Sequence, residues 1–306
     1  MAIAVASTST VVGNDQDSLT ITAPTGIAAG DKLVIAVAAG SLDNVITSTG
    51  FTESFSYQFN AFGVGEDGGF TVLYKTAVGA DESATNYTIS NTNTGRLGAA
   101  VMLRITGLNA GDPVFAFDTG AVNIPANTVD VSESFTASRP TDSIMCILAT
   151  MFGDNTSAGE ISFTNYSVTS GESNPSWTEV LDEDQFDTGG ANNYYGAMGF
   201  AYANSTNNTD ITGYGFRYQE VSSLDDSYQG IYAFFTIQEP ASASGSNVLV
   251  TTDTTLFSAS GTTGATGTTE LLTTTTETFT ASGQGRRSTT WTNETRPSTT
   301  WNNEPK

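Results

Sequence analysis

Short apolar runs and alternating apolar and polar residues recur along the chain from its start to about Pro240. The runs are bounded by Gly, Asn and Asp, and helical periodicity is nearly absent, which is typical of β-strands joined by turns. The pattern predicts strands over residues 18–22, 32–39, 70–75, 87–90, 99–106, 129–135, 143–151, 177–181, 195–202, 211–218 and 230–237.

The spacing of these strands, with long connections between them, favours an all-β fold: a two-sheet antiparallel β-sandwich that is jelly-roll-like. Residues 32–39 are continuously apolar after the turn signal Gly30-Asp31, so we expect a central strand that is covered on both faces. Residues 230–237 have the same character and precede Pro240, which predicts the last core strand.

Beyond Pro240 the composition changes to Ser, Thr, Gly and Ala, which divides the chain into a sandwich domain, 1–240, and an extended C-terminal arm, 241–306. The arm contains two internal repeats. Residues 249–261 align with 271–283, and Ser-Thr-Thr-Trp at 288–291 returns at 298–301. Such repetition indicates equivalent units that extend from the body.

Each terminal repeat carries one indole, one Glu and one Pro, and proline keeps the backbone from becoming helical. Large apolar side chains on a polar ribbon require burial sites, and we expect neighbouring subunits to supply them. The expected assembly anchors are Trp291, Trp301, Phe257, Phe279, Glu294 and Glu304. Repeated arms also suit symmetric sites, so a homo-oligomer is expected.

The strong negative charge of the chain makes some classes of binding partner unfavourable. The chain has 32 acidic and 10 basic residues and a formal net charge of -22. This charge repels a phosphate backbone and an anionic bilayer, so neither nucleic acid nor membrane insertion is expected. The N-terminus lacks the basic and apolar regions of a signal peptide, and no apolar run reaches the roughly 20 residues of a spanning helix.

Catalytic chemistry has few candidates. The chain has no histidine, which removes imidazole catalysis and His-ligated zinc, and its one cysteine, Cys146, lies in an apolar run that predicts a buried core thiol. The acidic groups Asp182-Glu-Asp184, Asp225-Asp226 and Glu66-Asp67 are compatible with a carboxylate glycosidase, but loops of so acidic a chain are expected to contain such groups. We therefore expect no enzyme.

Neither a cofactor nor a metal is expected. Ca²⁺ is the one cation to consider, because Asp15-Gln-Asp17, Asp182-Glu-Asp184 and Asp225-Asp226 gather oxygen ligands, yet none has the spacing of an EF-hand loop. The glycine-rich segment 63–69 carries two acids and no lysine, and it is interpreted as a hairpin loop.

Aromatic residues in the later part of the chain are candidates for carbohydrate stacking. Most of them alternate within predicted strands and are expected to pack in the core or on a sheet face. The remaining candidates for a glycan-binding surface are Trp177, Tyr194, Tyr195 and Tyr228.

The segment 23–32 before an apolar strand, the stretch Leu73-Tyr-Lys-Thr-Ala77 and the terminal Thr-Thr-Trp-Thr-Asn-Glu-Thr-Arg-Pro repeat resemble virion proteins of tailed bacteriophages. The terminal motif is the more specific, although it covers only about twenty residues. The resemblance implies an accessory role in the head, collar or tail of a virion, and it carries over no catalytic residue.

Three functions follow in order of expectation. The first is a structural virion protein, such as a head decoration, collar or tail accessory protein, whose arm docks on other virion proteins and on copies of itself. The second is a receptor-binding adhesin that recognises a host surface glycan. The third is a polysaccharide depolymerase with paired carboxylates.

Overall fold

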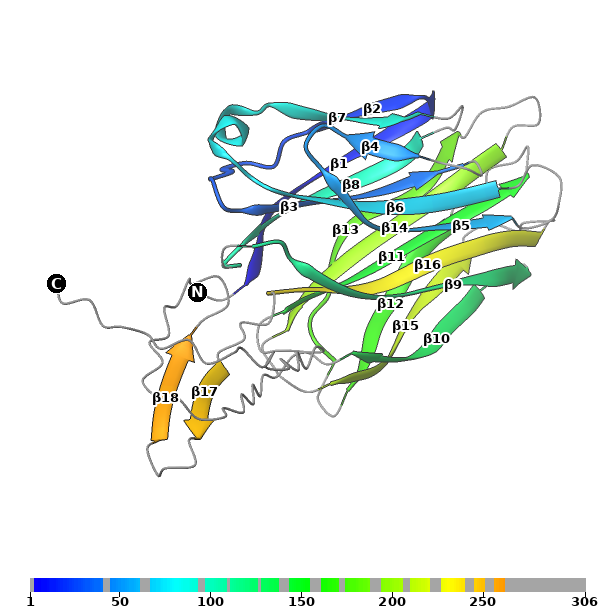
Figure 1. Ribbon diagram of the computed structural model, residues 1–306. Coiled ribbons are helices and arrows are strands. Elements are labelled where there is room, and N and C mark those ends of the chain that lie inside the picture. Colours follow the sequence, from blue (N-terminus) through cyan, green and yellow to red (C-terminus); the bar gives the residue numbers. More distant parts are fainter. Residues whose placement is uncertain are drawn as a thin grey trace, which may run out of the picture. The chain divides into compact units, whose positions relative to one another are not determined.

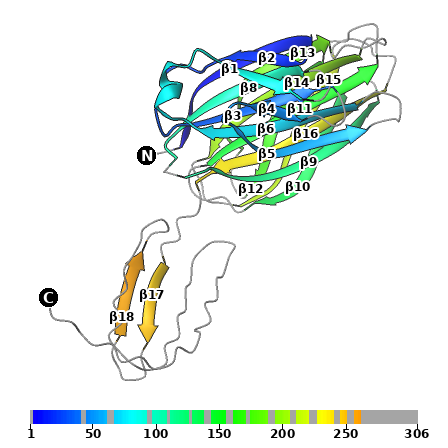
Figure 2. The same ribbon diagram turned by 45° about the horizontal axis from the view of Figure 1, so that its top comes forward.

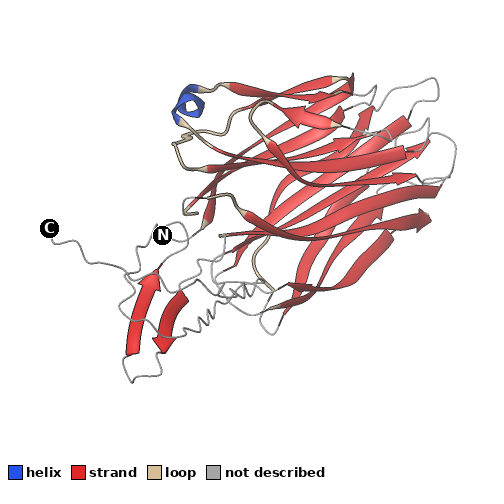
Figure 3. Ribbon diagram, in the orientation of Figure 1, coloured by secondary structure: helices blue, strands red, loops and turns tan. Residues whose placement is uncertain are grey.

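The computed structural model describes residues 3–40, 45–60, 67–92, 97–108, 111–125, 128–137, 143–154, 161–170, 174–187, 194–205, 210–220, 227–239, 245–250 and 256–261. The chain divides into two compact units, Met1–Pro240 and Ala241–Lys306. The first unit, called the body below, consists of antiparallel strands (Figures 1 and 3).

The body contains two five-stranded sheets. Sheet A has the strand order β1 (Ala4–Gln16), β8 (Leu97–Thr106), β3 (Lys32–Ala39), β6 (Asp67–Thr76) and β5 (Thr52–Asn60). Sheet C has the order β13 (Thr178–Asp187), β14 (Tyr194–Ser205), β11 (Ser143–Asp154), β16 (Ser227–Gln238) and β9 (Val114–Pro125).

Two three-stranded sheets complete the body. Sheet B has the order β2 (Ser18–Thr22), β7 (Asn86–Asn91) and β4 (Ile46–Ser48). Sheet D has the order β10 (Thr128–Ala137), β15 (Ile211–Glu220) and β12 (Ile161–Ser170). The one helical element among the described residues is the short 3₁₀ turn η1 (Gly79–Ser83), and no described helix is long and apolar enough to span a membrane.

The four sheets stack in the order B, A, C, D, with a separate apolar core in each of the three gaps. Alternate residues of β3 enter different cores: Leu33 and Ile35 face sheet B, whereas Val34 and Ala36 face sheet C. All eight residues of β3 are buried, which confirms a central strand covered on both faces. The antiparallel β-sandwich is confirmed, but four sheets are stacked where the strand spacing predicted two.

The body contains one strand topology twice, which we call the duplication. The first half, β1 to β8, and the second half, β9 to β16, have the same topology: replacing each strand of sheets A and B by the strand eight positions later gives the strand orders of sheets C and D. Each half is thus a sandwich of five and three strands. The predicted jelly-roll-like domain corresponds to two sandwiches that stack through their five-stranded sheets (Figure 1), and the strands of both halves overlap when the view is turned by 45° (Figure 2).

The halves are related by an approximate twofold axis along the strands. Edge strand β1 lies against β13, the counterpart of β5, and β5 lies against β9, the counterpart of β1. The Phe55 and Phe117 rings stack across the second contact with centroids 4.3 Å apart. Tyr74 and Phe115 also meet across the A–C core, with centroids 5.5 Å apart. An isologous contact of this kind is what two copies of one domain form.

This symmetry gives the body two different ends. At one end, called the terminus end, β1 begins at Ala4 opposite Thr106 of β8, and β16 finishes at Gln238 opposite Val114 of β9. At the other end, called the far end, Ala39 pairs with Leu97 in the first half and Asp154 pairs with Tyr194 in the second half. The chain therefore enters and leaves the body at the same end (Figure 1).

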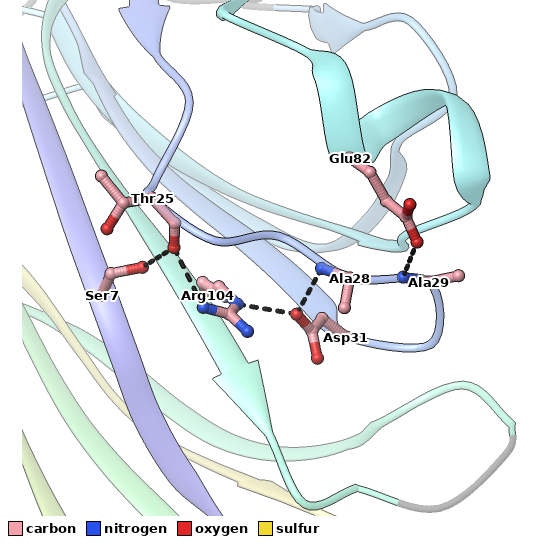
Figure 4. Close-up of polar contacts among 7 residues, drawn as sticks. All are labelled: Ser7, Thr25, Ala28, Ala29, Asp31, Glu82 and Arg104. Atoms are coloured by element: carbon pink, nitrogen blue, oxygen red, sulfur yellow. Dashed lines mark hydrogen bonds and ion pairs between the residues drawn. The ribbon is translucent and has the colours of Figure 1, made fainter.

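The connection between β2 and β3 is pinned at the terminus end by charged side chains (Figure 4). The Arg104 Nε atom donates to the Asp31 carboxylate at 2.7 Å, and its Nη1 atom donates to the Thr25 carbonyl at 3.0 Å. The Asp31 carboxylate also accepts from the backbone N–H of Ala28 at 2.9 Å. The second turn of this connection is held by Glu82, which accepts from the N–H of Ala29.

The second unit is described only in part. Strands β17 (Gly245–Val250) and β18 (Leu256–Gly261) pair in an antiparallel hairpin, and the backbone of Phe257 is paired with Leu249. Residues 251–255 and 262–306, which include both terminal repeats, lie outside the described part of the chain.

Close packing between sheets C and D generates a first prediction. A Cβ atom on Gly199 of β14 would lie 2.3 Å from Cγ of Phe163 in β12, whereas a Cβ atom on Gly79 would have open space. Gly199→Ala is expected to lower the free energy of unfolding by about 1–3 kcal/mol through overpacking. Gly79→Ala is the control and should change it little. Urea unfolding measures both, and equal stability of the two variants would contradict the packing of β12 on β14.

Candidate functional site

The expected assembly anchors are not brought together by the described part of the chain. Phe257 lies in β18, where only the backbone is described. The other five lie outside the described residues: Phe279, Trp291, Trp301, Glu294 and Glu304. Their role stays a prediction.

Three of the four glycan candidates lie together at the far end of sheet C. Tyr195 of β14 pairs with Gly153 of β11, and Tyr194 pairs with Asp154. On the other side of β11, Tyr228 of β16 is adjacent to Gln229, which pairs with Phe152. Backbone register therefore places the three tyrosines on two strands that flank β11, although their side chains are outside the described part.

Trp177 is separate from the tyrosines, because it precedes β13 at the terminus end. Its indole is partly exposed and packs against the core between sheets C and D. The Nε1–H donates to Oδ1 of Asn174 at 3.2 Å, and the same amide bonds the backbone of edge strand β12 at Tyr166 and Val168. The indole ring is thereby fixed 6.1 Å from the Tyr166 ring.

Two β-bulges, one in β13 and one in β12, direct further polar side chains toward the Trp177 indole. In β13, Glu179 pairs with Ala201 but Leu181 pairs with the adjacent Phe200, so one extra residue puts Glu179 and Asp182 on the same face. In β12 the register shifts between Thr164 and Ser167, where Asn165 has a φ of 58°. Asn tolerates this left-handed conformation better than most residues.

The second bulge turns Tyr166 toward the core face on which Phe163 also lies. Asp182 then accepts a hydrogen bond from the N–H of Phe163 at 3.1 Å, which ties sheet C to sheet D. The result is a cluster of Tyr166, Trp177, Glu179 and Asp182 between two edge strands. We call it the Trp177 cluster.

Electrostatics in the Trp177 cluster favour a positive partner. Burial and then the charge of Asp182 raise the pKa of Glu179, with an opposing effect from the Tyr166 hydroxyl. Burial, followed by the charges of both carboxylates, raises the pKa of Tyr166. The Tyr166 hydroxyl is fully buried and has no hydrogen-bond partner of good geometry, although Glu179 is close enough to act on it. A cation would stabilise the ionised form of the Glu179 and Asp182 carboxyl groups.

The side chains of Asp182 and Glu183 leave opposite faces of β13. Successive residues of a strand point to opposite faces, and Asp182 faces sheet D. Among the described residues no group of three or more His, Cys, Asp or Glu side chains could hold a metal ion. The side chains of Asp15, Glu66, Asp67, Asp184, Asp225 and Asp226 lie outside that part of the chain. Cys146 is buried as predicted, and burial raises the pKa of its thiol.

The first half contains a counterpart of the Trp177 cluster. Phe51-Thr52-Glu53 precedes the bulge of β5 as Trp177-Thr178-Glu179 precedes that of β13, with Thr52 opposite Tyr74 and Thr178 opposite Tyr202. In the first half the body itself supplies a cation, Lys75, beside the aromatic ring. The Lys75 ammonium lies 5.8 Å from the Phe51 ring centroid and 5.7 Å from that of Tyr87.

The Lys75 ammonium is paired with the buried carboxylate of Asp81. Lys75 Nζ lies 2.6 Å from Asp81, which also accepts from the Tyr87 hydroxyl at 3.0 Å and from the N–H of Val78 at 2.8 Å. In the second half the residue that follows Tyr202, as Lys75 follows Tyr74, is Ala203. The second half thus keeps the aromatic ring and the glutamate but not this lysine.

Tyr166 and Glu179 did not emerge from the sequence pattern. Simple alternation places residues 179 and 182 on opposite faces of a strand, and only the bulge reverses this. The available signal was the repeated tripeptide of aromatic residue, Thr and Glu at 51–53 and 177–179.

The Asp81 network generates a prediction on pH. Burial alone would raise the pKa of Asp81, but hydrogen bonds from Lys75, Val78 and Tyr87 and the lysine charge lower it below the ordinary 3.8. Asp81→Asn should cost about 2 kcal/mol of stability at pH 7, the loss of hydrogen bonds to a charged group. Because the folded-state pKa is depressed, this contribution is present above 3.8 and is lost as the pH falls through the folded value.

Urea unfolding at neutral and at acidic pH measures the difference between wild type and variant. Asp130→Asn is the control, since Asp130 pairs with Arg217 on an exposed surface where ion pairs contribute little. A difference that stays constant down to low pH would contradict the assignment.

Comparisons with known protein families, with curated proteins and with solved structures return no match for this chain.

Proposed function

We propose that this protein is a structural virion protein of a tailed bacteriophage, a head decoration, collar or tail accessory protein. Its body is a rigid spacer, and residues 241–306 anchor it to other virion proteins and to copies of itself. No catalytic step is assigned to it. The resemblance of the terminal repeat is one support for this proposal.

The observation that carries the proposal is that the first and last strands of the body have their outer ends at the same end of the body. Strand β1 begins and strand β16 finishes at the terminus end, so the chain leads toward the anchoring segment from one end and leaves the far end for other contacts. Burial of both faces of sheets A and C suits a load-bearing block. This arrangement suits a protein that is attached to a particle through one end and makes other contacts through the opposite end.

A second candidate function, recognition of a host surface glycan, is favoured by the placement of Tyr194, Tyr195 and Tyr228 at the far end. Tyrosine is a residue type that can stack on sugar rings, and the backbone places all three positions at the far end of the body. Under this reading the adhesin function adds to the structural one.

Deletion of residues 286–306 tests the anchoring role. Particles assembled with the truncated chain should contain at least about tenfold less of it, because burial of two indoles contributes more than the 1.4 kcal/mol of a tenfold change. The finer variant Trp291→Ala/Trp301→Ala should act similarly, whereas Thr290→Ala/Thr300→Ala is the matched control. Incorporation is measured by mass spectrometry of purified particles. Normal incorporation of the truncated chain would refute the anchoring role.

A glycan array probed with the full chain tests the second candidate. Binding should be lost in Tyr195→Ala and Tyr228→Ala and kept in Trp177→Ala, because Trp177 lies at the opposite end of the body. Loss confined to Trp177→Ala would place sugar recognition at the terminus end, and unchanged binding in all three variants would remove both candidates.

A further inference from the structure

The charges of the chain are unevenly divided. Of the 32 acidic residues 27 lie within 1–240, together with only six of the 10 basic residues. The terminal segment 284–306 is the reverse, with two acidic residues and four basic ones: Arg286, Arg287, Arg296 and Lys306. The segment is therefore complementary in charge to the body.

The described basic side chains of the body are already engaged within it. Lys75, Arg104 and Arg217 pair with Asp81, Asp31 and Asp130. Lys32 is buried and donates to the Thr76 hydroxyl at 2.9 Å, and burial lowers its pKa against the opposing charge of Asp112. Arg96 and Arg139 of the body lie outside the described residues, and among the described basic side chains none is left unengaged for a further acidic site.

The duplication identifies one such acidic site. In the first half the aromatic ring beside the repeated Thr-Glu pair is covered by Lys75, a cation of the body itself. In the second half Ala203 takes the corresponding position, and no described basic side chain contributes to the electrostatics of Glu179 or Tyr166. The same local architecture is thus present twice, and among the described residues only the first copy has a cation.

The geometry of the Trp177 cluster suits a guanidinium. An indole face attracts a cation within about 6 Å, and arginine is the side chain that most often stacks in this way. The exposed Glu179 carboxylate can accept two parallel N–H donors. The Tyr166 hydroxyl, more than nine-tenths buried and without a partner of good geometry, points into the same place. The body already holds Arg104 by a carboxylate and a carbonyl (Figure 4).

We infer that the Trp177 cluster is a receptor for an arginine side chain of the terminal segment 284–306 of a second copy of this chain. The inference deepens the proposed assembly function and rests on it, because it names the surface on which the arm docks. The terminus end, where Trp177 lies, is also the end from which the arm departs. Copies joined through their arms would meet there.

Arg296 is the central candidate, because it lies five residues from both Trp291 and Trp301. Five residues of extended chain span about 17 Å, so an arginine seated on Trp177 would place an indole on either side of the cluster. Arg286 and Arg287 precede this unit and supply further positive charge.

Sedimentation velocity of the full chain tests the inference in solution. Wild type should self-associate at low ionic strength and less so as salt screens the charges. Glu179→Lys puts a cation beside Asp182 and should weaken association at least about tenfold. The triple variant Arg286→Ala/Arg287→Ala/Arg296→Ala should do the same. A mixture of the two variants should associate again, since the intact arm of one can dock on the intact cluster of the other.

The matched control is Glu53→Lys, which makes the same charge change at the equivalent position of the first half, where Lys75 already supplies the cation. It should associate as wild type does. Unfolding midpoints confirm that the variants are folded. A monomeric wild type, undiminished association of Glu179→Lys, or a mixture that stays monomeric would each overturn the inference, the last because an intact arm and an intact cluster would then fail to bind one another.

Association in solution does not depend on a virion. If it fails while incorporation into particles still requires the arm, the arginine site is wrong and the assembly function stands. If association holds and incorporation is normal without the arm, the arginine site stands and the assembly function is wrong.

Discussion

The structure depends on burying both faces of the two five-stranded sheets. A strand that is apolar on both faces, such as β3 or β11, cannot face water on either side, so each sheet requires two covering layers. One three-stranded sheet covers the outer face of each, and the two five-stranded sheets cover one another. The stacking of the halves is therefore a consequence of strand composition, and the common direction of their ends follows from the twofold relation between them.

Duplication gives two copies of each local arrangement, and the copies have diverged where charge is concerned. The bulge of β5 and that of β13 each present an aromatic residue, a threonine and a glutamate. Lys75 and Asp81 complete the first copy and bury its charges as a pair. The second copy keeps carboxylates and a buried hydroxyl at a partly exposed ring, an arrangement that an outside cation would complete. In a chain of net charge -22, the basic terminal segment is the natural source within the chain.

Much of the fold was readable from the sequence, because apolar runs identify strands buried on both faces. All predicted strands are present, and those at 18–22 and 32–39 have the predicted bounds. The missed strands of the body, β1, β4, β5, β9 and β12, are edge strands in their sheets, where Ser, Thr and acidic residues replace the apolar pattern. The duplication was also missed, since equivalent strands share topology but little sequence. Tyr166 and Glu179 depend on bulges, which alternation cannot foresee.

Hydrogen exchange of the full chain, followed by mass spectrometry in low concentrations of denaturant, tests most directly whether the two halves form one block. Amides of β3 in the first half and β11 in the second should open with the same free energy and the same dependence on denaturant, because loss of either half exposes the core between sheets A and C. Exchange of one half through an opening of clearly lower free energy, with the other half still protected, would contradict this account.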